Sequence, residues 1–283
     1  MIDSHCHLDD AVFDDDRGEM LVRAFAAGVS GMLIPAIRPR TWPALAALPA
    51  RYPKAPLAIA LGVHPQVVPE LDAAERALAT DATALAAALA AARTPETLAV
   101  GECGLDGGTA DRAAQEDIFR AHVRAARELG LPLVVHVLRA HDAVPRILRE
   151  ERARDVGGVL HSYSGPPEMV PVYRDLGFAF SFAGAVTRAN ARRPLLSAQA
   201  VPDELLLTET DAPDQTPGAA GAHGRSEPAM VVEIVAALAR IRGQAAADVV
   251  ASTAANARRL FKADTLWRAT PLSRSPPGLP RLS

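Results

Sequence analysis

Short apolar segments that alternate with helix-like segments are the feature that most constrains the fold of this chain. Eight such segments occur, at residues 1–5, 29–35, 57–62, 98–102, 131–137, 157–162, 178–182 and 205–210. The helix-like segments are residues 17–27, 41–50, 72–92, 111–129, 141–153, 167–176 and 190–199, followed by a pair at 227–241 and 245–262. Near-continuous apolar strands that alternate with helices predict a parallel sheet covered on both faces. The fold class is therefore α/β, and eight units predict a single (β/α)8 TIM barrel with extra C-terminal helices.

An open doubly wound sheet is the alternative architecture. Such a fold usually has fewer strands and a glycine-rich phosphate-binding turn after the first one. Here the first segment runs into His5-Cys6-His7 instead, and a length of 283 residues suits one barrel of about 250 residues. We expect one domain over residues 1–262. Residues 263–283 are rich in proline and serine and are expected to form a flexible tail.

Composition limits the classes of function and the compartment. The net charge is −3, so the chain lacks the broad basic footprint of a general nucleic-acid binder. A phosphate substrate stays possible, because bound metal ions can supply positive charge locally. The two cysteines, Cys6 and Cys103, indicate no disulfide framework and favour a reducing compartment. With neither a signal peptide nor an apolar run of about 18 residues, we expect a cytoplasmic protein without a membrane contact or an obligate protein partner.

Ionisable residues gather where the predicted strands end. These residues are His5, His7, Glu102, His136, His161 and Asp211. In a barrel such positions meet at the C-terminal mouth, where the active site of this architecture lies. Imidazoles and carboxylates suit Zn, Mn, Fe or Mg, and burying so many of them without a counter-charge would be costly. The set exceeds the needs of one tetrahedral site, so two neighbouring ions are expected, with Glu102 as a possible bridge.

Each of these residues has an ordinary explanation when it is taken alone. A single histidine near a strand end is usually a core or loop residue, and Asp211 before Ala-Pro could simply begin a turn. His64 and the His141-Asp142 pair belong in this class more readily than the others. Cys6 and Cys103 lie beside candidate ligands and are interpreted as small buried packing residues. The coincidence of six residues at successive strand ends is what favours a metal site.

Six motifs occur in the order and at the spacing seen in a known family. They are DSHCHLD, ALGVHP, GECGLD, HSYSG, LLLTETDAP and STAANARRLF. The chain resembles the TatD family of metal-dependent deoxyribonucleases, which belong to the wider amidohydrolase-like barrels, over residues 1–262. The resemblance implies two divalent ions, Mg, Mn or Zn, with Glu102 shared between them. It places His5, His7 and Asp211 on one ion and His136 and His161 on the other. From its position beside them, we expect Asp3 to orient the first two histidines or to pack below them.

The chain also departs from the family pattern, chiefly at positions that would touch substrate. Gly107 and Gly108 follow GLD, where many members have aromatic residues. An arginine usually lies two residues after the histidine of the fifth strand, but here Arg139 comes one place later. An RNEP-like stretch reads RSEP, which puts Arg225 near the mouth.

The resemblance and the residues together predict a hydrolase with a metal-bound hydroxide that cleaves phosphodiester bonds, trimming single-stranded DNA or 3′ ends as a 3′–5′ exonuclease would. Glu102 and Asp211 are the predicted catalytic residues, with Asp211 accepting the proton of the attacking water. The predicted substrate contacts are Arg139, Arg225, His64 and Tyr163. Two rival interpretations are a hydrolase of a small ester, amide or lactone, and a non-catalytic metal-binding scaffold. The few aromatic residues favour the first rival mildly, and the complete ligand set argues against the second.

Overall fold

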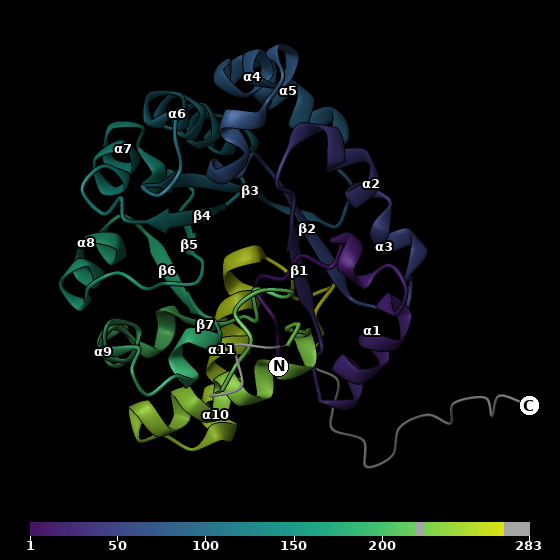
Figure 1. Cartoon of the computed structure of the whole chain (residues 1–283), viewed down its shortest axis with the longest axis vertical. Coiled ribbons are helices and arrows are strands. Elements are labelled where there is room, and N and C mark those ends of the chain that lie inside the picture. Colours follow the sequence, from purple (N-terminus) through teal and green to yellow (C-terminus); the bar gives the residue numbers. More distant parts are fainter. Residues whose placement is uncertain (219–223, 269–283) are drawn as a thin grey trace, which may run out of the picture.

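The computed structural model describes residues 1–218 and 224–268, and a parallel seven-stranded sheet forms their centre. The strands are β1 (Met32–Pro35), β2 (Leu57–Leu61), β3 (Thr97–Asp106), β4 (Leu133–Leu138), β5 (Gly158–Leu160), β6 (Phe178–Phe182) and β7 (Leu206–Thr208). They are hydrogen-bonded in chain order, and the sheet curls with the helices around its outside (Figure 1). The predicted α/β class with a helix-covered parallel sheet is thus confirmed.

The helices follow the predicted segments, with two exceptions. They are α1 (Arg17–Ala26), α2 (Trp42–Ala46), α3 (Leu48–Arg51), α4 (Ala73–Thr80), α5 (Ala82–Ala92), α6 (Arg112–Leu129), α7 (Val144–Glu150), α8 (Val170–Asp175), α9 (Arg192–Ala200), α10 (Val231–Arg242) and α11 (Ala246–Phe261). The helix expected over 72–92 divides at Asp81, whose carboxylate accepts hydrogen bonds from the backbone of Thr83 and Ala84 and begins α5. The helix expected over 41–50 divides at Ala47, without a capping side chain and with Pro49 in the first turn of α3.

The first predicted strand, residues 1–5, is not a strand. Asp3 forms a single parallel bridge with Met32, and the backbone N–H of Leu33 donates to the carbonyl of Asp3. The next N–H, that of Ser4, instead donates to the carbonyl of Thr208 in β7. Successive residues thus bond to opposite neighbours, as they do in an interior strand of a parallel sheet, but the pairing with β1 amounts to one bridge. This N-terminal segment lies between β1 and β7 and is hydrogen-bonded to both.

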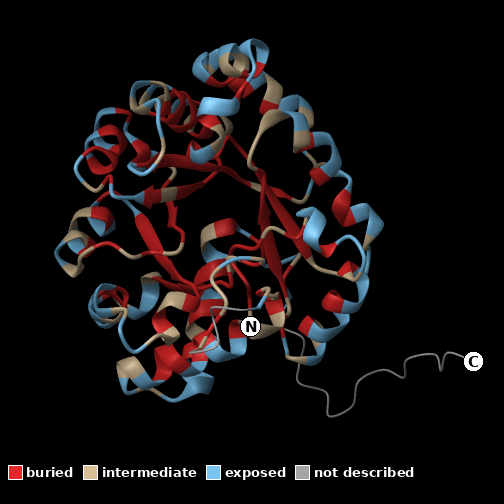
Figure 2. Cartoon of the chain, viewed as in Figure 1, coloured by how far each residue is buried: buried red, intermediate tan, exposed pale blue. Residues whose placement is uncertain are grey.

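Alternation along the strands separates two apolar clusters. Leu33, Ala58, Ala60 and Val134 face one side of the sheet, where they pack with residues of α11. Their neighbours along the strands pack against the surrounding helices. Figure 2 shows the strands mostly buried and the exposed residues mainly on the outer faces of the helices. Apolar packing of the two clusters and of α11 thus fills the body of the sheet. The polar residues collect at the carboxyl ends of the strands.

Packing extends beyond the predicted domain boundary at residue 262. Trp267 is fully buried and lies edge-to-face against Phe261, with 5.9 Å between ring centroids. Its indole N–H donates to the carbonyl of Pro56 at 3.1 Å. The rest of the predicted tail, residues 269–283, lies outside the described residues. In the part of the chain that the structure describes, no helix is both long and apolar enough to span a bilayer.

Replacing Trp267 by alanine tests whether this segment belongs to the folded core. We expect Trp267→Ala to lower the free energy of unfolding by roughly 3–5 kcal/mol, because it removes a fully buried indole and leaves a cavity. Urea denaturation followed by circular dichroism measures the change. Val232→Ala, at an exposed position of α10, is the control and should stay within about 0.5 kcal/mol of the unchanged protein. Equal stability of the two variants would contradict a packed Trp267.

Candidate metal centre

The carboxyl ends of the strands bring all six predicted ligands together. His5 and His7 follow the bridge at Asp3, and Glu102 and His136 lie within β3 and β4. The other two come directly after β5 and shortly after β7, and are His161 and Asp211. Glu102, at the centre of the cluster, is fully buried. Residues far apart in the sequence meet here because parallel strands all end at the same edge.

One oxygen of Glu102 faces three histidines. Oε1 lies 2.8 Å from Nε2 of His64 and 2.7 Å from Nε2 of His161. The same oxygen lies 3.1 Å from Nδ1 of His136, and that Nδ1 is 3.0 Å from Nε2 of His161. The ring nitrogens therefore converge on a single carboxylate oxygen.

The other oxygen of Glu102 faces a different set of side chains. Oε2 lies 3.1 Å from Nε2 of His5 and 3.7 Å from Nε2 of His7. These two nitrogens are also 3.6 Å and 3.8 Å from Oδ1 of Asp211. Two groups of donors thus lie on either side of one carboxylate, in the division that the sequence predicts for two ions.

A bulge in β3 directs Glu102 toward the cluster. The register of β3 with β4 shifts between Val100 and Cys103, which is how a bulge re-aims a side chain. Gly101 and Gly104 flank the bulge with φ of 140° and 138°, a region that is essentially restricted to glycine. A Cβ on Gly104 would lie 2.0 Å from the carbonyl oxygen of His136. The two glycines of GECG therefore allow both the bulge and the close approach of β4.

Further carboxylates contact the outward nitrogens of two histidines. Oδ2 of Asp106 lies 3.4 Å from Nε2 of His136 and accepts a hydrogen bond from the Gln66 amide at 2.8 Å. Oε1 of Glu209 lies 3.6 Å from Nδ1 of His161. Carboxylates in such positions orient imidazole rings and make them better ligands. Sequence reasoning did not single out Asp106 and Glu209, although both are acidic residues at strand ends within the quoted motifs GECGLD and LLLTETDAP.

His64 belongs to the group around Oε1, yet its hydrogen bonds give it a different role from its neighbours. Its Nδ1 accepts the backbone N–H of Gln66 at 3.1 Å, so in the neutral ring the proton is on Nε2. Burial lowers the pKa of His64 to about 4, although Glu102 opposes that shift. His64 is thus neutral near pH 7 and points an N–H at Glu102. A protonated Nε2 can donate a hydrogen bond but has no lone pair for a metal.

The cluster carries a buried negative charge. Burial raises the pKa of Glu102, but the imidazoles around it, His161 foremost, outweigh burial and hold that pKa well below its ordinary value. Burial lowers the pKa of His161, while Glu102 outweighs burial and raises it well above normal. Burial and the charge of His161 lower the pKa of His5. A carboxylate at the centre is therefore ionised, as metal ligation requires.

Unsatisfied atoms show that this donor set fits cations. Oε2 of Glu102 and Nδ1 of His5 are buried, and neither has a hydrogen bond of good geometry from the described residues. An unpaired buried acceptor costs about 1–3 kcal/mol, and more when it is charged. Imidazole nitrogens and carboxylate oxygens in one cluster are ligands for Zn, Mn or Mg. A bound cation would satisfy the oxygen that the protein leaves without a donor.

Asp3 ties the first two histidines to the end of β7. Its buried carboxylate accepts hydrogen bonds from the backbone N–H of Thr210 at 2.9 Å and from the Thr210 hydroxyl at 2.6 Å. Burial raises the pKa of Asp3 to about 8, although the hydrogen bonds from Thr210 oppose that shift. Asp3 does not contact the imidazole rings in the structure. It positions the segment that carries His5 and His7 rather than the rings themselves.

The predicted substrate contacts lie in quite different surroundings. The guanidinium of Arg225 pairs with Asp16 at 2.6 Å and stacks on the ring of Phe13. Tyr163 is buried, and its hydroxyl donates to the carbonyl of Pro166. Arg139 is exposed directly after β4, with a left-handed backbone at φ 50°. Of these three residues, Arg139 is the one available to a ligand at the carboxyl end of the sheet.

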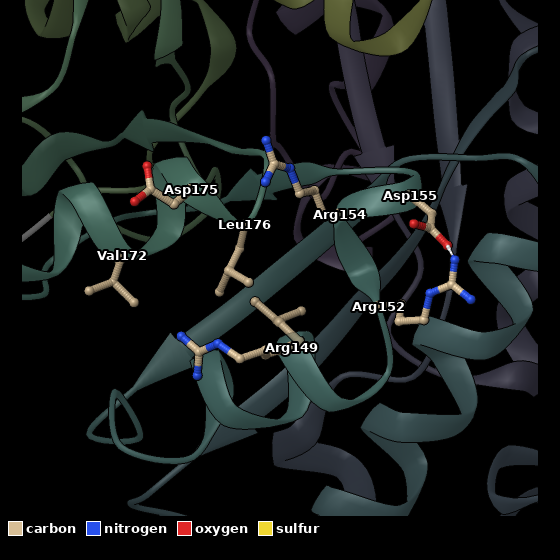
Figure 3. Close-up of a pocket in the computed structure, with 8 residues that line it drawn as sticks. Arg149, Arg152, Arg154, Asp155, Val172, Asp175 and Leu176 are labelled. Atoms are coloured by element: carbon tan, nitrogen blue, oxygen red, sulfur yellow. Dashed lines mark ion pairs between the residues drawn. The ribbon is translucent and has the colours of Figure 1, made fainter.

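Two pockets occur at opposite ends of the sheet. The smaller, of about 140 Å³, lies at the cluster and is lined by residues that include His136, His161, Asp211 and Gln215. The larger, of about 460 Å³, lies between the end of α7 and the end of α8. Figure 3 shows arginines around it, among them Arg149 and Arg154, which both come from the segment between β4 and β5. Chemistry by the cluster therefore belongs to the smaller pocket.

Comparison with known proteins gives consistent matches over nearly the whole chain. A family model described as TatD related DNase matches residues 2–262. The chain is 34% identical over 271 residues to the 3'-5' ssDNA/RNA exonuclease TatD of Escherichia fergusonii, covering 92% of this chain and 98% of that protein. It is 30% identical to the uncharacterized metal-dependent hydrolase YabD of Bacillus subtilis, covering 93% and 99%. The crystal structure of YJJV, a TatD homolog from Escherichia coli K12, superposes with a TM-score of 0.84 at 28% identity, covering 93% and 98%.

Substitution of Gly104 tests whether the bulge positions Glu102. We expect Gly104→Ala to lower the free energy of unfolding by at least about 1–3 kcal/mol through backbone strain, with a further cost from the clash with His136. It should also reduce the number of ions bound per chain, because Glu102 and His136 move apart. Urea denaturation and elemental analysis after dialysis measure the two effects.

Gly18→Ala is the matched control, since a Cβ there meets nothing within 4 Å. Within α1 it should leave ion binding unchanged and alter stability by no more than about 1 kcal/mol, in the stabilising direction. If both alanine variants bind ions equally well, the bulge does not control the position of Glu102.

Proposed function

Because the chain belongs to the TatD family, we propose that it is a divalent-metal-dependent hydrolase that removes nucleotides from the 3′ end of single-stranded DNA. The TatD protein of Escherichia fergusonii is named a 3'-5' ssDNA/RNA exonuclease, which supports both the substrate and the direction of cleavage. The bond that breaks is a phosphodiester, and water is the second reactant.

The fold supports the proposal. The N-terminal segment occupies the place of an eighth strand, because it is hydrogen-bonded to β1 on one side and β7 on the other. We infer that the whole is a (β/α)8 barrel with α10 and α11 as its additional helices. In that architecture the carboxyl ends of the strands form the active-site mouth, where the cluster lies.

The position of Glu102 is the observation that carries the proposal. Its two oxygens face two separate groups of donors, as a carboxylate shared by two cations would. One ion would be held by His5, His7, Asp211 and Glu102, and the other by His136, His161 and Glu102. Two bound divalent ions supply positive charge for a phosphate and lower the pKa of a water molecule.

The protein side chains then have distinct tasks. Asp211 lines the pocket, with Oδ2 accepting a hydrogen bond from the Gln215 amide at 2.8 Å and Oδ1 facing the histidines. It is placed to accept a proton from the attacking water. His64 directs its Nε2–H at Glu102 and holds that carboxylate in place, and Arg139 offers a guanidinium fork to a phosphate. Asp106 and Glu209 hold the rings of His136 and His161 in place.

A second candidate function is hydrolysis of a small ester, amide or lactone. The volume of the pocket, about 140 Å³, favours a small substrate. Tyr163, shortly after β5, and Phe182, at the end of β6, are aromatic residues near the strand ends, but both are buried, so neither is available as a platform for base stacking. The same donors would serve that reaction, and only the choice of substrate distinguishes it.

Metal replacement and a substitution at the shared carboxylate test the nuclease. Protein stripped with a chelator should leave an end-labelled single-stranded DNA intact, and Mg, Mn or Zn should restore cleavage. Loss of nucleotides one at a time from the 3′ end is the expected gel pattern. Glu102→Gln should lower the rate at least roughly 1,000-fold, because the neutral amide offers one acceptor oxygen where the carboxylate offers two.

The result that would overturn the nuclease is an intact DNA with every metal, from protein that measurably binds ions. Hydrolysis of small carboxylic esters by the same protein would then establish the second candidate. Glu102→Gln, purified identically, excludes a contaminating nuclease as the source of any cleavage.

His64 and His136 should respond differently to substitution. We expect His64→Leu to keep about two ions per chain while the cleavage rate falls roughly 100-fold, because the N–H that faces Glu102 is lost. His136→Gln should lose about one ion. Elemental analysis after dialysis measures the ions, and gel assays measure the rate. Loss of an ion from His64→Leu would mean that His64 is a ligand instead.

A further inference from the structure

The carboxyl end of the sheet has an uneven distribution of charge. Near the N-terminal segment, arginines are neutralised by carboxylates: Arg17 pairs with Asp14 at 2.7 Å, and Arg225 with Asp16 at 2.6 Å. Arg23 pairs with both Asp16 and Glu227. Further carboxylates on this side have no arginine partner within 4 Å among residues 1–218 and 224–268, and these are Asp9, Asp10, Asp15 and Asp214. This side of the site is therefore acidic.

The opposite side, beyond the ends of β4 and β6, carries four arginines. These rim arginines are Arg139, Arg188, Arg192 and Arg193. Among the described residues none of them has a carboxylate within 4 Å, and the remaining segments, 219–223 and 269–283, contain neither Asp nor Glu. The carboxylates on segments of this side are Asp142 and Glu168, so positive charge is in excess.

Contacts place the rim arginines around the pocket of the metal centre. Leu138, immediately before Arg139, lines that pocket. The guanidinium of Arg188 donates to the carbonyl of Thr216 at 3.3 Å, beside Gln215, which lines the pocket too.

Arg193, at the start of α9, lies on the same side of the site as His141, which comes two residues after Arg139. Ser197 of α9 donates a hydrogen bond to the carbonyl of Gly165 at 2.7 Å, and a Cβ on Gly165 would lie 2.3 Å from the His141 ring, so α9 packs beside that ring. Burial lowers the pKa of His141, and the charge of Arg193 lowers it further.

We propose that the rim arginines form a track for the phosphate backbone of a single-stranded nucleic acid, which leaves the metal centre across the ends of β4 and β6. Guanidinium groups bind phosphate oxygens through paired hydrogen bonds, and here no ion pair must first be broken. The acidic side repels the backbone, so the strand cannot continue past the metal centre. A chain end, rather than an internal bond, is thereby placed at the cluster.

This inference rests on the proposed nuclease function, and a matched pair of double variants tests it. Arg192→Ala with Arg193→Ala removes two arginines of the track at the start of α9. Arg149→Ala with Arg154→Ala removes two exposed arginines of the larger pocket at the other end of the sheet (Figure 3), which also lack a carboxylate within 4 Å among the described residues. Both double variants change the net charge equally.

Fluorescence anisotropy with a labelled single-stranded oligothymidylate, in chelator and at several salt concentrations, measures binding apart from catalysis. Each phosphate contact contributes about 0.7 to the slope of the logarithm of the binding constant against the logarithm of the salt concentration. Loss of two contacts should therefore reduce the magnitude of that slope by about 1.4 in the track variant, and the slope should stay unchanged in the control. Metal-dependent hydrolysis of bis(p-nitrophenyl) phosphate, which is too small to reach the track, should be equal in all three proteins.

Equal slopes in the two double variants would overturn the track. Failure of the protein without substitutions to bind the oligonucleotide would overturn it too. Slower hydrolysis of bis(p-nitrophenyl) phosphate by the track variant would also overturn it, because the substitutions would then act on the metal centre. If the oligonucleotide binds as expected but no metal restores its cleavage, the nuclease fails while the track stands.

Discussion

The buried charge of Glu102 is the interaction on which the site depends. A carboxylate at the centre of a protein is costly unless positive charge or hydrogen-bond donors surround it. Imidazoles on both sides provide part of that compensation, and they hold the pKa of Glu102 well below its ordinary value. One oxygen still lacks a hydrogen bond from the described residues. The site is therefore built around a charge that only a bound cation satisfies completely.

Much of the surrounding structure serves to place that carboxylate and its partners. The glycines at 101 and 104 allow the bulge of β3 and the close approach of β4. Asp3 secures the segment of His5 and His7 to the end of β7 through Thr210. These contacts involve the backbone rather than the ligand atoms. They hold the donors in place from more than one element of the fold.

Hydrogen bonding also separates the histidines of the cluster by role. His136 and His161 each turn one nitrogen to Glu102 and the other toward an outer carboxylate. His64 turns Nδ1 to a backbone N–H instead, which leaves its proton on the inward nitrogen. Proximity alone would make it a ligand, but its tautomer makes it a donor. The arginines around the cluster also fall into two groups. Those near the N-terminal segment pair with carboxylates, and those beyond β4 and β6 do not.

The sequence by itself determined the α/β class, the family and the six residues at the strand ends, because a period of apolar segments and an ordered set of motifs are local properties of a chain. It did not predict that the pairing of residues 1–5 with β1 would amount to one bridge, or that Trp267 would pack into the core. The partners of Arg225 and the tautomer of His64 were equally beyond it. Those features depend on contacts between residues distant in the chain, and only the tertiary structure decides them.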